Sequence, residues 1–263
     1  MRSSKSLLAA CLLLCTAATA LPFADAALAE DTRITVMVIS RGAKFVGSSM
    51  GGVQISIEDS DTGEVLATGV TEGSTGDTDR VMRTEHGRDR VLSTPGAARF
   101  ETVLDLESPR RLRFIARGPL AQRQAMNEVS ATQWVVPGKH LTGGDGFLLE
   151  LPGFAVDVLS PPTHVRAGEA PLEVELRANV VMMCGCPITP GGLWDADGYE
   201  IRALLHRDGE KVAEVPLGYA GQASQFATTW TVPEPGLYHA VVYAYDQATG
   251  NTGVDETTFI VQR

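Results

Sequence analysis

The sequence predicts an all-β protein built from two consecutive β-sandwich domains. Three observations support this prediction. Short runs in which apolar and polar residues alternate recur along the chain, as in strands with one buried face. The 27 glycines and 14 prolines supply many turns between short strands. A length of 263 residues, with 44% hydrophobic and 21% charged residues, suffices for two ordinary globular domains.

The first 29 residues are predicted to be a signal peptide. Arg2 and Lys5 give a basic start, residues 7–20 form an apolar run, and residues 27–29 (Ala-Leu-Ala) offer a small-x-small cleavage site. A lipoprotein-like box at residues 8–11 follows too short an apolar run to serve as a signal. We therefore expect a periplasmic or secreted protein.

The mature chain is expected to be acidic. The whole sequence has a formal net charge of −10, and removing residues 1–29 takes away Arg2, Lys5 and Asp25, which leaves −11. This balance argues against nucleic acid or an anionic membrane as a partner, because both attract a basic face. No later segment reaches roughly 18 apolar residues, the length of a membrane-spanning helix. We expect a protein partner in the cell envelope.

The first domain is predicted over residues 30–159. Pro119 favours a short helix, since proline is well placed in a first helical turn. Paired prolines at the end of the domain cannot lie inside a sheet, so residues 159–163 are interpreted as a linker. Strands are expected at residues 31–39, 53–57, 64–70, 99–106, 111–117, 134–136 and 147–151, and the helix at residues 119–130.

One hairpin of the first domain resembles a known family. Residues 59–63 read Asp-Ser-Asp-Thr-Gly between two alternating strands, which predicts a hairpin corner. Over residues 50–75 this hairpin resembles the transthyretin-like or carboxypeptidase-regulatory-like sandwich. The sequence departs from that family at residues 72–97, where a long, polar and charged insertion follows. We interpret the insertion as a mobile solvated loop, with a binding lid as the alternative.

The second domain is predicted over residues 160–263. Leu172, Val174 and Leu176 alternate with charged residues, the pattern of a half-buried strand. About six or seven short strands within roughly 100 residues indicate a sandwich. The other strands are expected at residues 199–206, 211–215, 226–232, 237–245 and 257–261.

A second resemblance covers residues 154–263. Residues 235–240 read Pro-Gly-Leu-Tyr-His-Ala and resemble the tyrosine-corner strand F of immunoglobulin-like and fibronectin-III-like domains. Tyr238 matches the corner tyrosine, and Ala240 stands where immunoglobulins place a cysteine. The resemblance implies an immunoglobulin-like sandwich without the inter-sheet disulfide. It also implies that the B–C connection, residues 178–199, lies at the same end as the F–G turn.

The candidate site is segment 180–188, which reads Val-Val-Met-Met-Cys-Gly-Cys-Pro-Ile. Cys11 and Cys15 leave with the signal, so Cys184 and Cys186 alone remain in the mature chain. Cysteines in an oxidising compartment usually join distant segments, which this pair cannot do. On the implied fold the segment should lie near Tyr245, Asp246 and Asn251.

Three readings of the cysteine pair stay open. In the first, Cys184 and Cys186 bind copper(I) with the thioether of Met183 or Met182, because soft sulfur ligands select this metal. In the second, they form a local disulfide, which requires a turn at Gly185. In the third, they are inert packed residues.

Other patterns give weaker signals. His206 and His239 could serve as further ligands from neighbouring strands, and His239 is expected to face outward from strand F. Residues 47–51 match G-x-S-x-G, but a strand and not the helix of a nucleophile elbow follows. Residues 195–198 resemble the opening of a calcium loop without its later ligands. We find no other catalytic or cofactor motif.

The sequence therefore favours an exported, non-enzymatic binding or accessory protein. Its working end would be the Met-Cys-Gly-Cys loop, reachable from outside, which handles copper or engages a thiol redox partner. The alternative is a structural, adhesion or protein-interaction module in which the two cysteines form a local disulfide. An enzyme has almost no support in the sequence.

Overall fold

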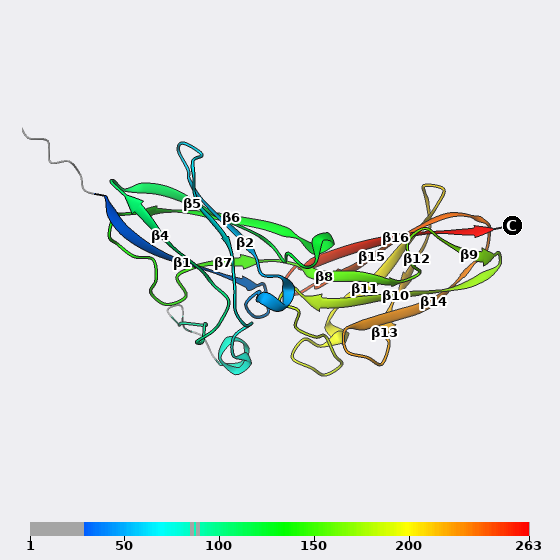
Figure 1. Ribbon diagram of the computed structural model, residues 1–263. Helices are drawn as coiled ribbons and strands as arrows, with labels where there is room; N and C mark the ends of the chain where they lie inside the picture. The colour runs from blue at the N-terminus through cyan, green and yellow to red at the C-terminus, as the bar shows by residue number, and fades with distance from the viewer. Residues whose placement is uncertain (1–28, 85–86, 88–89, 263) are drawn as a thin grey trace, which may run out of the picture.

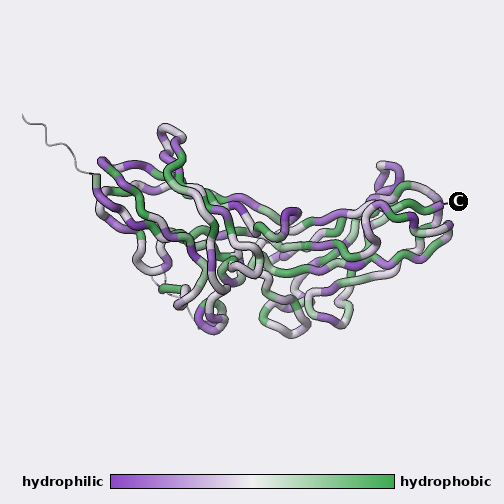
Figure 2. Tube along the Cα trace, viewed as in Figure 1, coloured by the Kyte–Doolittle hydropathy of each residue, from purple (hydrophilic) through white to green (hydrophobic). Residues whose placement is uncertain are grey.

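The computed structural model describes residues 29–84, 87 and 90–262, and the predicted signal peptide, residues 1–29, falls almost wholly outside them. Four sheets form two sandwiches that lie end to end (Figure 1). The predicted all-β fold with two consecutive sandwiches is confirmed. Hydrophobic and hydrophilic residues follow one another at short intervals along the strands (Figure 2). Within the described part of the chain, no helix is long and apolar enough to cross a membrane.

The N-terminal sandwich has one three-stranded and one four-stranded sheet. The first has the order β4-β1-β7, with β1 antiparallel to β4 and parallel to β7, and the second is antiparallel with the order β3-β2-β5-β6. The two sheets pack face to face, and apolar side chains such as Val36, Ile55 and Phe114 form the core between them. The strands are β1 (Glu30–Ser40), β2 (Gln54–Asp59), β3 (Val65–Val70), β4 (Phe100–Leu106), β5 (Arg110–Gly118), β6 (Asn127–Val135) and β7 (Phe147–Leu151).

The C-terminal sandwich is immunoglobulin-like. Its sheets have the orders β13-β14-β10-β8 and β12-β11-β15-β16-β9, which correspond to strands D-E-B-A and to a sheet containing C, F and G. The Tyr238 hydroxyl donates to the Glu234 carbonyl (2.8 Å), so the predicted tyrosine corner is confirmed. The strands are β8 (Phe154–Ser160), β9 (Val165–Glu169), β10 (Leu172–Met182), β11 (Glu200–Arg207), β12 (Glu210–Pro216), β13 (Gly218–Tyr219), β14 (Gln225–Val232), β15 (Gly236–Tyr245) and β16 (Thr252–Gln262).

The predicted β2–β3 hairpin is confirmed, and its corner is built by one carboxylate. The Asp59 Oδ1 atom accepts hydrogen bonds from the backbone N–H groups of Asp61 (2.9 Å) and Thr62 (3.0 Å). Asp59 is therefore the side chain that fixes the turn. The remaining regular segments are short helical turns: η1 (Ser48–Met50), η2 (Asp79–Arg83), η3 (Arg123–Ala125) and η4 (Ala196–Gly198).

The helix predicted at residues 119–130 is wrong. Only η3 is helical there, and from Asn127 onward the chain forms β6, which pairs with β5 along its whole length. Val129, Ala131 and Gln133 lie on one face of β6, and the residues between them lie on the other, as in any strand. Pairing with the open edge of β5 outweighs local helix propensity, as tertiary context commonly does.

The described residues of the insertion at 72–97 are anchored to the first domain at several points, which corrects the expectation of a solvated loop there. Val81 and Ala97 form a separate apolar cluster with Met37 and Phe45. The Asp145 carboxylate accepts hydrogen bonds from the backbone N–H groups of Leu92 (2.9 Å) and Ser93 (2.8 Å). The insertion covers Met37 and Ile39, the apolar residues on the outward face of β1, so this part of the strand needs a cover on both faces.

The chain enters the second sandwich before the predicted linker at residues 159–163. Strand β8 pairs with β10, so residues 154–159, expected in the first domain, are hydrogen-bonded to the second. Pro161 and Pro162 come directly after β8. Here the chain leaves the sheet that contains β8 and crosses to the facing sheet, where it forms β9. Proline cannot donate a ladder hydrogen bond, so a change of sheet is a suitable place for it.

Candidate functional site

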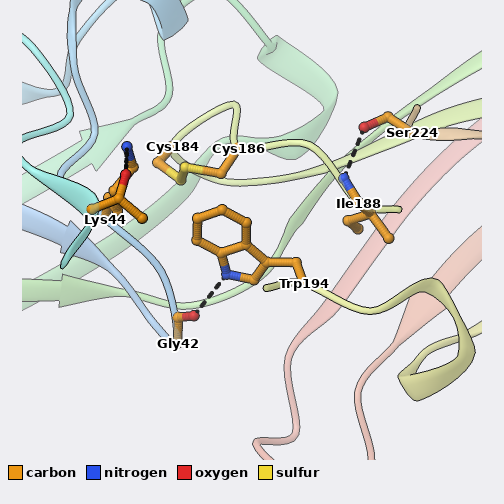
Figure 3. Close-up of a disulfide and its surroundings, with 8 residues drawn as sticks. Gly42, Lys44, Cys184, Cys186, Ile188, Trp194 and Ser224 are labelled. Carbon is orange, nitrogen blue, oxygen red and sulfur yellow. Dashed lines mark hydrogen bonds between the residues drawn. A yellow bond between two sulfur atoms is a disulfide. The ribbon is translucent and has the colours of Figure 1, made fainter. Parts of the chain in front are cut away.

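The two cysteines lie in a tight hairpin at the end of β10. The Met182 N–H donates to the Cys186 carbonyl (3.2 Å), and the Gly185 N–H donates to the Met182 carbonyl (2.7 Å). Gly185 has a φ of 75°, in the left-handed region that favours glycine. The turn brings the Cα atoms of Cys184 and Cys186 within 5.4 Å, and the pair forms a disulfide (Figure 3). The disulfide reading, with its turn at Gly185, agrees with the structure.

The disulfide is sealed from solvent. Cys184 is 1% exposed and Cys186 is 5% exposed. Gly185 faces the first domain, where a Cβ atom on it would lie 2.8 Å from the Met50 Sδ atom. The expectation that the sulfurs are reachable from outside is therefore wrong, because the first domain covers the end of the second sandwich that carries them. The pair is both oxidised and packed.

Two further contacts join the domains at this end. The Trp194 Nε1–H donates to the Gly42 carbonyl (3.0 Å; Figure 3), and the Asn251 Nδ2–H donates to the Arg41 carbonyl (3.0 Å). Trp194 lies in the β10–β11 connection and Asn251 precedes β16, so the B–C and F–G connections share one end, as expected. We call this region the joint, comprising residues 41–43 and Met50 of the first domain with residues 183–186, Trp194 and Asn251 of the second.

The two apolar cores interlock at the joint. Ala43 of the first domain is buried in the core of the second sandwich. In the opposite direction, Met183 and Ala155 are buried in the core of the first, and Met183 is fully buried. Burial of a methionine side chain contributes about 1.5–3 kcal/mol. The two domains are therefore held together at the joint by side-chain packing as well as by the continuous chain.

A carboxylate organises the F–G turn behind Asn251. Asp246 accepts hydrogen bonds from the Ala248 N–H (2.8 Å) and the Thr249 hydroxyl (2.6 Å), and its own N–H donates to the Asn251 carbonyl (2.9 Å). Burial raises the pKa of the neighbouring Tyr199 phenol, and the Asp246 charge raises it further. Asp246 thus holds the turn that presents Asn251 to the first domain.

The calcium-like pattern at residues 195–198 has a structural role in the B–C connection. The Asp195 Oδ1 atom accepts hydrogen bonds from the backbone N–H groups of Gly191 (2.9 Å) and Asp197 (3.2 Å), so it caps the turn η4. Glu200, two residues further on, accepts a hydrogen bond from the Tyr243 hydroxyl (2.5 Å).

The residues predicted to hold copper are only partly brought together. Met182 packs in the second core with Cys184 and Cys186, whereas Met183 packs in the first core. A disulfide has no free thiolate to offer a metal. Across the described residues, no group of three or more His, Cys, Asp and Glu side chains suits a metal ion. Copper binding by Met182, Met183, Cys184 and Cys186 stays a prediction.

The two histidines lie away from the joint. His206 and His239 face each other across β11 and β15, with ring centroids 5.9 Å apart, and His239 Nε2 lies 3.0 Å from the Glu256 carboxylate. His239 is six residues before Tyr245, the joint end of β15. At the usual rise of a strand this separation is about 20 Å, too far for a shared site with the cysteines.

The solved structures that resemble this chain are only distantly similar to it. No protein-family model matches the chain, and no curated protein matches it. Fibronectin(III)-like modules of Clostridium thermocellum CbhA are 13% identical, over 90% of this chain and 92% of theirs, with a TM-score of 0.28. The titin domains Z1Z2, in complex with telethonin, are 10% identical over 88% and 96%, with a TM-score of 0.25. An engineered protein is 15% identical over 49% of this chain and only 24% of its own, with a TM-score of 0.32.

Proposed function

We propose that the chain is an exported, non-enzymatic structural or protein-interaction module whose disulfide hairpin braces the joint between two sandwiches. The observation that supports this most is the position of the hairpin. Its sulfurs are buried where the two domains meet, and its glycine abuts Met50 of the first domain. A loop so placed serves to fix domain geometry, because neither a metal nor a thiol partner reaches it from solvent in this arrangement.

The disulfide itself contributes little through chain entropy. For the three-residue loop that it closes, the loop-closure relation gives about 1.6 kcal/mol. Its role is instead to hold the hairpin in the shape that fits between Met50 and Trp194. The apolar contacts and the two hydrogen bonds across the joint then act on a preformed surface. The basic start and cleavage pattern of residues 1–29 support export, where such a disulfide persists.

The experiment measures how rigidly the joint holds the two sandwiches. Spin labels on Glu107→Cys and Glu210→Cys, both exposed and one on each sandwich, report the distance between domains. We expect one narrow distance distribution for the oxidised protein and a broader one for the Cys184→Ser/Cys186→Ser variant. A label pair within the second sandwich, on Glu210→Cys and Val254→Cys, is the matched control and should not change.

The same variants separate the proposed function from copper handling. An unchanged inter-domain distribution in the double serine variant would contradict the bracing role. Copper(I) retained at one equivalent by the reduced wild type, and lost in the double serine variant, would favour the soft-metal reading instead. Export is tested separately by the cellular location and N-terminal sequence of the full-length chain after expression.

A further inference from the structure

Three histidines lie in one row across a sheet of the C-terminal sandwich. His206 in β11 and His239 in β15 are directly opposite each other, and His239 is in turn opposite Thr258 in β16. The Thr258 hydroxyl lies 2.8 Å from Nδ1 of His164, which comes just before β9. The sequence has five histidines, so this row holds more than half of them.

The two central histidines are close enough to share a metal ion. The ring centroids of His206 and His239 are 5.9 Å apart. Two imidazoles bound to one Zn²⁺ at about 2.0–2.1 Å hold their centroids roughly 5–6.5 Å apart. Residues directly opposite each other in an antiparallel pair carry their side chains on the same face, so the backbone already sets this spacing. Both rings can reach one ion without movement of β11 or β15.

Glu256 of β16 supplies an oxygen ligand beside these rings. Its Oε2 atom lies 3.0 Å from His239 Nε2. Nitrogen and oxygen ligands of one tetrahedral Zn²⁺ are roughly 3–3.5 Å apart, so these two atoms already have the separation of two ligands. The side chains of His239 and Glu256 are 39% and 65% exposed. An ion can therefore reach them from solvent, and water can complete its coordination.

The third ligand, His206, requires a rotation of its ring. As the side chains stand, no three His, Cys, Asp or Glu residues of the described chain converge on one point. The Nδ1 atom of His206 is buried and has no hydrogen-bond partner. A buried polar atom without a partner is unfavourable. No hydrogen bond of Nδ1 therefore opposes rotation of the ring, and a rotation that brings this nitrogen out toward His239 removes the cost of burying it.

We propose that His206, His239 and Glu256 bind one Zn²⁺ on the exposed face of this sheet. Two imidazoles and a carboxylate are a ligand set that zinc accepts in proteins. The ion takes the place of the proton shared by His239 and Glu256, and this proton is released to solvent. Because the three ligands come from β11, β15 and β16, the bound ion connects three neighbouring strands.

The surrounding charges are compatible with a bound cation. Lys211 lies opposite His206 in β12, but its ammonium group is paired with the Glu214 carboxylate (2.7 Å), which compensates its charge. The whole chain has a formal charge of −10. This excess of negative charge attracts cations at long range.

The test is calorimetric titration of the chelator-treated mature protein with Zn²⁺. We expect one equivalent to bind, with an affinity that falls by more than about tenfold in His239→Ala and in Glu256→Gln, since each loses a ligand or its charge. His140→Ala is the matched control, because it removes an exposed histidine of the first domain, and its affinity should equal that of the wild type. Mg²⁺ prefers oxygen ligands and should not compete with Zn²⁺.

Thermal unfolding gives the second readout. Zn²⁺ should raise the melting temperature of the wild type and of the Cys184→Ser/Cys186→Ser variant, because it binds the folded sheet away from the joint, and should not change that of His239→Ala. Circular dichroism should show His239→Ala and Glu256→Gln folded, since both side chains are exposed. The absence of saturable Zn²⁺ binding would overturn the proposal. So would equal affinity in these two variants and the wild type, or binding lost with the cysteines alone.

Discussion

Replacing Asn251 by alanine should weaken the joint strongly. The Asn251 side chain is fully buried, accepts a hydrogen bond from the Gly153 N–H (3.0 Å) and donates one to the Arg41 carbonyl (3.0 Å). Asn251→Ala leaves both backbone groups without this partner. Each buried polar group without a partner costs about 1–3 kcal/mol, so the expected loss for the two groups is about 2–6 kcal/mol in the free energy of unfolding. That is a large fraction of the stability of an ordinary domain.

The assay is urea unfolding followed by circular dichroism and tryptophan fluorescence, since Trp194 lies in the joint. Asn251→Asp keeps the acceptor for the Gly153 N–H but sets a buried carboxylate against the Arg41 carbonyl oxygen, so its loss should be at least as large as that of Asn251→Ala. Thr252→Ala, exposed on the next residue, is the matched control and should stay within about 0.5 kcal/mol of the wild type. An Asn251→Ala loss no larger than that of Thr252→Ala would refute the reasoning.

Three further predictions test the packing and electrostatics around this account. Met183→Ala should cost about 2–5 kcal/mol in unfolding free energy through the cavity it leaves in the first core, measured by urea unfolding. Tyr238→Phe removes the hydroxyl bond to the Glu234 carbonyl and should cost about 0.5–1.5 kcal/mol in the same assay. Burial raises the pKa of Asp157 above its ordinary value of 3.8, and the Asp255 charge raises it further. Protonated Asp157 therefore contributes stability that is present at pH values below 3.8 and is lost as the pH rises through the raised pKa of the folded state. The Asp157→Asn variant should therefore have a higher melting temperature than the wild type at pH 7 and a similar one at pH 3. A variant that melts at the same temperature as the wild type at pH 7 as well as at pH 3 would contradict this.

The sequence was most informative where a pattern depends on backbone geometry alone. The alternation in β10 and the Pro-Gly-Leu-Tyr motif predicted an immunoglobulin-like sandwich, because a strand with one buried face and a tyrosine corner are local features. The local disulfide was one of three open interpretations, and its stated requirement, a turn at Gly185, is met by the left-handed φ of 75° there.

The joint could not be predicted in the same way. Met50 lies in a glycine-rich turn far from Cys184 in the sequence, and nothing in either segment indicates that they touch. The burial of the disulfide depends on that contact, so the sequence reading placed it on an exposed end. One signal was present in β1, where Met37 and Ile39 are apolar on the outward face and indicated a cover that residues 72–97 supply.

The most direct test of the brace is a thiol count on the mature protein under three conditions. We expect no free thiol in the native protein and none after brief mild reduction, because Cys184 and Cys186 are sealed within the joint. Two thiols should react once the protein is reduced in denaturant. Two reactive thiols in the native protein, or rapid reduction without denaturant, would contradict the account.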